Sequence, residues 1–370
     1  MKEFFNKKRV ELIAAEISEA VGNFNVDVFI MQACAGLNAL ELKERSKHIA
    51  NAMKMQLPVE TKKNYSHAIS QLLLAMGDPV DDGGLDGMDG FHHLPYLDFV
   101  ELYGHPYPIQ SLKALERMTQ FFSAEFAIRP FLLNDSEKTV RQMKRWSKHR
   151  DWRVRRLASE GTRPRLPWGK QIPQFIKDPS DILPILNTLY DDTNLVVRRS
   201  VANNLNDISK DHPELAANLA TDWLSNKSES AQWTAKHGLR TLVKQGNSTA
   251  LQALGFSGGE NITASNFTVT PKSLSIGEKL SISFDLYSEE KCSSKLVIDY
   301  VLERILANGK LARKVFKIAN TTMGNGQSLK FTKHHDFTQR STRTYYPGTH
   351  TIHIQVNGFI IAHRSFRLTR

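Results

Sequence analysis

Two hydrophobic periodicities divide the chain. Up to about residue 256, apolar residues recur at spacings of three and four, as in residues 25–58, where the pattern ends at Pro58. Beyond that point the spacing changes to an alternation of apolar and polar positions, seen in residues 267–288, 293–318 and 349–368. The change predicts two domains, a helical one over residues 1–256 and a domain of β-strands over residues 258–370.

A short motif repeats within the helical region. Val154-Arg155-Arg156 recurs as Val197-Arg198-Arg199, 43 residues on, and more loosely as Ala235-Lys236-His237, a further 38 residues on. Upstream, Glu125 aligns with Glu160 at a distance of 35 residues. A period of about 40 residues filled with helix pairs is typical of HEAT-like and armadillo arrays, which curve and present a concave surface. We therefore expect an all-α HEAT-like array.

The strand-rich region predicts a sandwich. About 110 residues of short alternating segments, separated by Gly-containing turns, are typical of an immunoglobulin-like fold. Asn357-Gly358, between two such segments, is a strong signal for a β-hairpin. The expected fold class is thus multidomain, with an all-α HEAT-like array followed by an all-β immunoglobulin-like sandwich.

Amphipathic faces point to a polar strip on the helical array. Asp151 is a suitable N-cap for a helix over residues 152–161, whose core face carries Val154 and Leu157. Trp152 and Arg156 fall on the opposite face. In the next repeat the face opposite Val197 and Val201 carries polar residues: Arg199, Asn203, Asn206 and Asp207. Stacked repeats would join these faces into one strip.

The charge distribution suggests a polyanionic partner. The formal net charge is +11, and residues 141–170 alone carry eleven Lys or Arg against Asp151 and Glu160. The last 113 residues add sixteen basic and eight acidic residues. Such concentration favours nucleic acid as the partner, because Arg and Asn donors suit phosphate oxygens. A solvated face that serves solubility remains the alternative.

Carboxylates and tryptophans within this basic region need a separate explanation. Carboxylates would repel a DNA backbone unless they have a role of their own. Glu125 lies among apolar residues, where a carboxylate is costly to desolvate unless it is paired, and Arg129, four residues on, is the partner to consider. All five tryptophans lie between positions 146 and 233, and Trp168 occupies a turn flanked by Pro and Gly. A cationic base in DNA could use phosphate-binding arginines, π faces and carboxylates together.

At these residues the chain resembles the DNA alkylation repair glycosylases of the AlkC and AlkD type, and specifically the AlkC branch. The resemblance is carried by "LELKERSKHIANAM", "TQFFSAEFAIRPFL", "WRVRRLASEGTRPRLPWG", "VRRSVANNLNDISKDHPE" and "WTAKHGLRTLVKQGN". It implies excision of N-alkylated bases such as 3-methyladenine and 3-methylcytosine from double-stranded DNA. It also implies four catalytic residues, which lie in these strings: Glu125, Glu160, Trp168 and Asp207.

The basic and aromatic residues of both domains give eight candidates for DNA contact: Trp152, Arg156, Arg163, Arg165, Arg199, Asn206, Arg340 and Arg343. The implied chemistry passes through an oxocarbenium-like sugar that carboxylates can stabilise. It requires no cofactor, and the sequence contains no P-loop, GxGxxG or HExxH motif, so we expect neither cofactor nor metal. A non-catalytic helical-repeat scaffold that binds DNA or protein remains the alternative.

The remaining signals concern location and assembly. The N-terminus carries charges through its only apolar stretch, and no run approaches the roughly 18 apolar residues that span a bilayer. Cys34 and Cys292 stand alone in different predicted domains, so neither a disulfide framework nor a thiolate metal site is expected. These signals predict a cytoplasmic protein that associates with the nucleoid through DNA and acts as a monomer.

Overall fold

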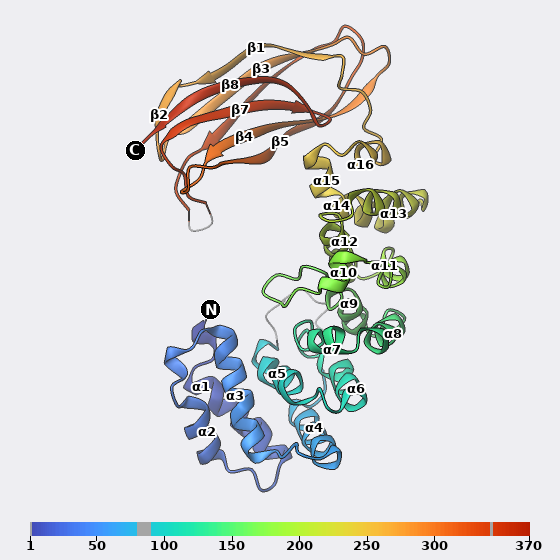
Figure 1. Ribbon diagram of the computed structural model, residues 1–370, viewed down its shortest axis with the longest axis vertical. Helices are drawn as coiled ribbons and strands as arrows, with labels where there is room; N and C mark the ends of the chain where they lie inside the picture. Colours follow the sequence, from blue (N-terminus) through green and yellow to red (C-terminus); the bar gives the residue numbers. More distant parts are fainter. Residues whose placement is uncertain (1, 80–89, 341–342) are drawn as a thin grey trace. The chain divides into compact units, whose positions relative to one another are not determined.

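The computed structural model describes residues 2–79, 90–340 and 343–370 (Figure 1). Helices fill the chain up to Ala253, and strands fill it from Ile262 onward. The chain forms two compact units, Met1–Asp211 with Ser228–Thr234, and His212–Lys227 with Ala235–Arg370. The expected order, an all-α region followed by an immunoglobulin-like all-β region, is confirmed. The compact units divide earlier than the change of secondary structure, because the last helices group with the strands.

Within the described residues the helices have these bounds: η1 (Lys2–Phe4), α1 (Lys7–Ala20), α2 (Val26–Cys34), η2 (Leu37–Ala39), α3 (Leu42–Gln56), α4 (Lys62–Met76), η3 (Phe91–His93), α5 (Leu94–Tyr103), α6 (Pro108–Met118), α7 (Arg129–Asn134), α8 (Ser136–Trp146), α9 (Trp152–Glu160), α10 (Pro173–Lys177), α11 (Leu183–Leu189), α12 (Leu195–Ile208), α13 (Pro213–Ser225), α14 (Glu229–Gly238), α15 (Arg240–Gln245) and α16 (Ser248–Ala253). None of them combines the length and apolar character that crossing a bilayer requires.

The repeat read from the sequence has a matching set of hydrogen bonds. Asp151 caps α9 and Asn194, 43 residues on, caps α12, each accepting from the backbone N–H two residues later. Arg155 Nη1 donates to the carbonyls of His149 and Arg150, and Arg198 Nη1 donates to the equivalent carbonyls six and five residues before it. The first arginine of each motif therefore fastens its helix to the preceding turn. The predicted helix at residues 152–161 is confirmed as α9, which packs beside α12.

The strands form two sheets. Their bounds are β1 (Ile262–Thr270), β2 (Ser273–Ser275), β3 (Lys279–Ser288), β4 (Ser294–Ile305), β5 (Leu311–Met323), β6 (Ser328–Asp336), β7 (Gly348–Val356) and β8 (Phe359–Thr369). One sheet has the order β1-β3-β6 and the other β2-β8-β7-β4-β5. Only β2 and β8 pair in parallel among the described strands.

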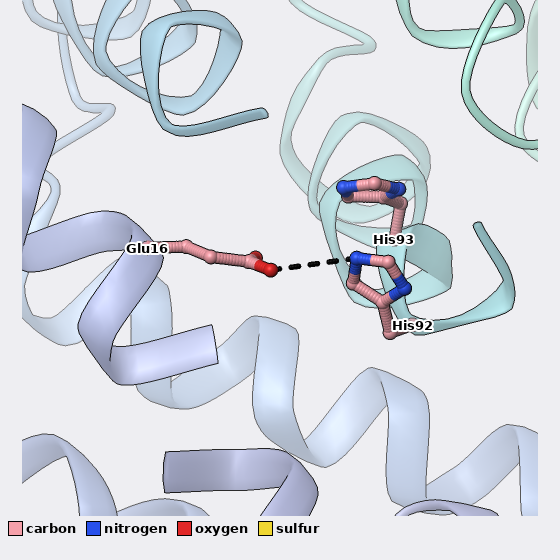
Figure 2. A group of neighbouring side chains, drawn as sticks. All are labelled: Glu16, His92 and His93. Atoms are coloured by element: carbon pink, nitrogen blue, oxygen red, sulfur yellow. Dashed lines mark ion pairs between the residues drawn. The ribbon is translucent and has the colours of Figure 1, made fainter. Parts of the chain in front are cut away.

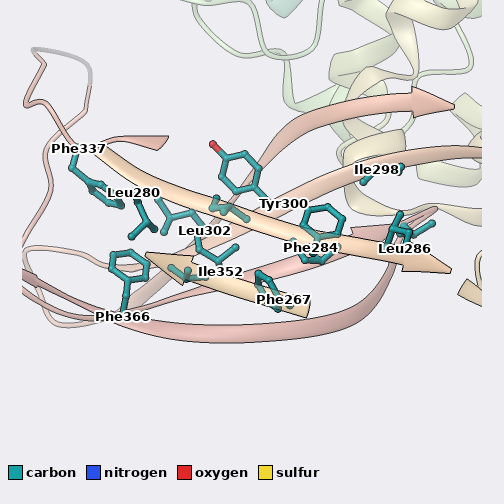
Figure 3. Packing of buried hydrophobic residues seen from close by; sticks show 14 of the residues in the cluster. Phe267, Leu280, Phe284, Leu286, Ile298, Tyr300, Leu302, Phe337, Ile352 and Phe366 are labelled. Atoms are coloured by element: carbon teal, nitrogen blue, oxygen red, sulfur yellow. The ribbon is translucent and has the colours of Figure 1, made fainter. Parts of the chain in front are cut away.

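Alternating residues of the strands fill one core between the sheets. Along β3, Leu280, Ile282, Phe284 and Leu286 are fully buried, while the residues that alternate with them, 281, 283 and 285, are only partly buried. Figure 3 shows these side chains packed against those of the other sheet, among them Leu302 and Phe366. A period of two therefore places one face of each strand in the core, as the sequence predicts for a sandwich.

The hairpin at Asn357-Gly358 joins β7 to β8, as predicted. Both residues have positive φ, 44° and 89°, the signs that a type I′ turn requires. A Cβ atom on Gly358 would lie 2.5 Å from the Cα atom of Gly246, which belongs to the same compact unit. Glycine is thus required here both by the backbone conformation and by close approach of another backbone segment.

We expect Gly358→Ala to destabilise the strand-containing unit by about 3 kcal/mol or more, since it adds a backbone clash to an unfavourable φ. Gly326→Ala is the matched control, because Gly326 has a φ of 73° but nothing within 4 Å of an added Cβ. The control substitution should lower the free energy of unfolding by only about 1 kcal/mol. Urea unfolding followed by circular dichroism measures both, and equal losses would show that the contact with Gly246 is unimportant.

Candidate functional site

Two buried carboxylates share one arginine. Glu160 is the last residue of α9 and Asp207 lies in the last turn of α12. Arg163, just after α9, donates from Nη1 to Glu160 Oε1 at 2.7 Å and from Nε to Asp207 Oδ2 at 2.8 Å. All three residues are buried, with exposed fractions of 6%, 2% and 8% for Glu160, Asp207 and Arg163. Because each carboxylate has a charged partner, their burial is tolerated.

A third carboxylate joins through a second arginine. Glu125 lies in the turn between α6 and α7, and its Oε2 accepts from Arg156 Nη2 at 2.9 Å and from Ser123 Oγ at 2.8 Å. Arg156, on α9, also acts electrostatically on Glu160. We refer to these five alternating charges as the charged row: Glu125, Arg156, Glu160, Arg163 and Asp207. It joins the three carboxylates in one network within one compact unit.

The charged row keeps Glu160 ionised. Burial by itself raises the pKa of Glu160, but the guanidinium groups of Arg156 and Arg163 and the Ser200 hydroxyl outweigh burial and lower that pKa below its ordinary value. Burial alone would lower the pKa of Arg156 and of Arg163, and the neighbouring carboxylates raise both. These charges are therefore fixed at neutral pH, and Glu160 has no proton to donate.

Arg129 shapes the adjacent loop. Its guanidinium group, 1% exposed, donates to the carbonyl oxygens of Gly161 and Arg163 at 3.1 and 3.0 Å, and also to that of Lys170. Burial and the nearby Arg163 charge lower the pKa of Arg129 to about 10, so it remains a cation at neutral pH. The three bonds fix both ends of the loop at residues 161–170.

The pairing of Glu125 with Arg129, considered from their spacing, is wrong as a side-chain ion pair. The helical pattern across residues 111–133 is interrupted, since α6 ends at Met118 and α7 begins only at Arg129. Glu125 therefore lies outside the helix that contains Arg129, and the four-residue spacing does not bring the two side chains together. Its ion-pair partner is Arg156 instead.

Trp168 projects from the same loop. Its side chain is exposed, at 73%, and its φ of 62° lies in the left-handed region. Its carbonyl oxygen accepts from Lys43 Nζ, on α3, at 2.8 Å. The same Nζ lies 3.6 Å from the ring centroid of Phe126, the residue after Glu125. The indole is thus left uncovered while its backbone is tied to the segment that carries Glu125.

Lys43, Ser123 and Lys210 belong to this site and were missed by the sequence analysis. Lys210 Nζ lies 2.9 Å from the second carboxylate oxygen of Asp207. Lys43 falls inside a string that carries the family resemblance, but no local periodicity marks it. Only the approach of α3 to the Trp168 loop gives Lys43 its contacts.

Three expected DNA contacts are placed differently. Arg156 and Arg163 point into the charged row and their donors are engaged by carboxylates and by Ser123. Asn206 is 6% exposed. The reason is that the face of α9 opposite its apolar residues packs against α12, where Asn204 Nδ2 donates to the Ser159 carbonyl at 2.8 Å. The strip expected at the surface is only partly an internal seam, because Arg163 and Asn206 are buried whereas the Arg156 side chain keeps 23% of its surface accessible. We therefore no longer assign phosphate contacts to Arg163 and Asn206, and the contact of Arg156 stays a prediction.

The other expected DNA contacts keep some exposure. Arg199 and Arg340 are exposed, Trp152 is half-buried beside the Arg153 guanidinium, and Arg165 forms a two-bond ion pair with Asp211 at 2.9 and 2.8 Å. Arg343, in the strand-containing unit, lies over the Phe316 ring and donates to the Tyr345 hydroxyl. These residues remain candidates for phosphate or base contact.

Comparison with known proteins shows which family the chain resembles. A family model described as DNA alkylation repair enzyme matches residues 117–242, and one described as the C-terminal Ig-like domain of uncharacterised protein YhaZ matches residues 263–370. The uncharacterized protein YhaZ of Bacillus subtilis (strain 168) is 38% identical over 359 residues, covering 97% of this chain and 96% of that protein.

A solved structure covers the whole chain. It is that of the Pseudomonas fluorescens alkylpurine DNA glycosylase AlkC bound to DNA containing an abasic site analog. It matches with a TM-score of 0.89 and 36% sequence identity, over 100% of this chain and 99% of that one. The resemblance found in the sequence is therefore confirmed over both the helical and the strand regions. The chain belongs to the AlkC branch of the DNA alkylation repair enzyme family, with a C-terminal Ig-like domain.

Proposed function

We propose that this protein is a monofunctional DNA glycosylase that hydrolyses the N-glycosidic bond of cationic N-alkylated bases, such as 3-methyladenine and 3-methylcytosine, in double-stranded DNA. The observation that carries the proposal is the charged row, in which each of three carboxylates is paired with an arginine, near an uncovered tryptophan. The likeness to the AlkC structure over the full chain supports the same activity.

The chemistry suits fixed negative charges. When the bond between C1′ and the base nitrogen breaks, its electron pair stays with the base and neutralises the positive charge that alkylation created. The base leaves neutral, so no general acid is needed. The sugar becomes an oxocarbenium-like cation, which ionised carboxylates stabilise. A water oxygen then bonds to C1′ and gives up its proton, which completes the hydrolysis.

The proposed roles follow accessibility. Glu125 is the most exposed of the three carboxylates, with 16% of its side chain accessible, against 8% for Glu160 and 2% for Asp207. We assign Glu125 to direct contact with the sugar or its water, Glu160 to electrostatic stabilisation of the cation, and Asp207 to holding Arg163. The Trp168 indole offers a π face to the cationic base or the sugar, an interaction of about 0.5–2 kcal/mol.

The activity itself is tested by incubating the protein with methylated duplex DNA and measuring released 3-methyladenine. We expect Glu160→Gln to bind an abasic-site duplex normally and to lose at least about a hundredfold in excision, because the amide keeps the shape but removes the charge. Glu137→Gln is the matched control, since Glu137 is exposed on α8.

If the folded wild-type protein released no base, the glycosylase proposal would be wrong and the non-catalytic scaffold would be the remaining hypothesis. Normal excision by Glu160→Gln would mean that Glu160 serves only as an ion-pair partner of Arg163.

Phosphate binding should depend on the exposed arginines. Arg199→Ala should reduce the salt dependence of DNA binding by about one unit of log–log slope, because it removes one phosphate contact. Arg163→Ala should instead destabilise the fold by about 3–5 kcal/mol, because it leaves Glu160 and Asp207 buried without their shared partner. Binding at several salt concentrations and urea unfolding separate the two effects. If Arg163→Ala instead reduced the salt dependence of DNA binding without changing stability, Arg163 would be a phosphate contact.

A further inference from the structure

A second cluster of ionisable side chains lies outside the charged row. Glu16 comes from α1, and His92 and His93 come from η3, the short helix that leads into α5. One ligand atom of each residue lies within 4.8 Å of the other two, and Figure 2 shows the carboxylate directed at the two imidazole rings. We propose that these three side chains form a binding site for a divalent transition metal ion of the zinc class. The proposal is independent of the glycosylase function.

The ligand spacing fits tetrahedral coordination. His92 Nε2 and Glu16 Oε1 are 3.4 Å apart. Two ligands about 2.1 Å from a zinc ion at the tetrahedral angle are separated by about 3.4 Å. Neighbouring ligands of an octahedral ion at the same distance would be about 3.0 Å apart. This separation is compatible with two ligands of one zinc ion. The His92 and His93 rings, whose centroids are 3.8 Å apart, would turn away from each other to share the ion.

The cluster is prepared for coordination. Tyr96, fully buried, donates its hydroxyl to Glu16 Oε2 at 2.8 Å, which orients the carboxylate and leaves Oε1 for an ion. His93 is 8% exposed, and its Nδ1 is buried with no hydrogen-bond partner among the described residues. An unpartnered, buried imidazole nitrogen is available as a metal ligand.

The surroundings leave one side open. The His93 ring packs against Phe121 and Tyr96, with ring centroids 5.3 and 5.6 Å away, so aromatic groups close the inner side. The side chains of His92 and Glu16 keep 25% and 31% of their surface accessible. Water can therefore reach a fourth position, as in zinc sites with three protein ligands.

The donor set selects among metal ions. Imidazole nitrogens suit zinc and its neighbours in the first transition row, whereas magnesium and calcium prefer oxygen ligands throughout. A bound ion would join α1 to the start of α5 and would stabilise the helices of this unit. The competing explanation is a protonated His92 that pairs with Glu16 without any metal, and the experiment must distinguish the two.

The test uses the full-length protein after removal of metals with a chelator. Titration with zinc chloride should show one zinc ion bound per chain by calorimetry and native mass spectrometry, and Tm should rise with zinc concentration. Cobalt should give the visible absorption bands of a tetrahedral site. Magnesium chloride should produce none of these effects.

Variants locate the ion. His92→Ala and Glu16→Gln should each lose the bound equivalent or weaken its binding at least about tenfold, together with the zinc-dependent rise in Tm. His67→Ala on α4 and Glu19→Gln on α1, both at exposed positions, are the matched controls and should bind zinc as the wild type does. Circular dichroism of the metal-free proteins verifies folding, and Glu16→Gln retains an amide oxygen for the Tyr96 hydroxyl.

Three results would overturn the proposal. The first is that the wild-type protein binds no zinc. The second is that the His92→Ala and Glu16→Gln variants bind zinc as tightly as the wild type does. The third is that Tm responds to pH but not to zinc. The last result would identify the cluster as a protonated ion pair.

Discussion

The shared pairing of Arg163 with Glu160 and Asp207 is the interaction on which the site depends. Two carboxylates can be buried at the ends of α9 and α12 because the Arg163 guanidinium group pairs with both, with Arg156 adding positive charge near Glu160 and Lys210 near Asp207. The pairing fixes how the two helices meet and where the following loop starts. Arg129 then fastens that loop at its backbone carbonyls, and Trp168 is carried outward by it. Removing the ion pairs would therefore disturb the loop as well as the carboxylates.

This arrangement separates catalysis from affinity. Positive charges that neutralise internal carboxylates contribute little to attracting phosphate, so in the proposed function DNA binding depends on arginines that remain exposed, such as Arg199 and Arg340. Glu160, whose pKa its arginine neighbours lower, keeps its charge in a partly dry environment, where electrostatic effects on a nearby cation are strong. A lesion that is already cationic requires only that such charges stand in position when its bond to the sugar breaks.

The two arginines of the repeated Val-Arg-Arg motif have different roles. The first one, Arg155 or Arg198, bonds to carbonyls of the preceding turn and holds the helix in the array. The second one faces a different environment in each copy. Arg156 is enclosed beside Glu125, whereas Arg199 is exposed. The second arginine of the motif therefore belongs to the charged row in one copy and lies at the protein surface in the other, although the residue type is the same.

The sequence by itself determined the order of helices and strands, the cap of α9 and the hairpin at Asn357-Gly358, and it predicted three catalytic carboxylates. Those features follow from local periodicity, turn chemistry and long matching strings. Only the tertiary structure decided which arginine pairs with which acid, because the partners lie 31 residues apart for Arg156 and Glu125 and 44 apart for Arg163 and Asp207. No local spacing encodes such contacts. They depend on how α9 packs against α12 and against the turn between α6 and α7, which encloses part of an apparently exposed polar face.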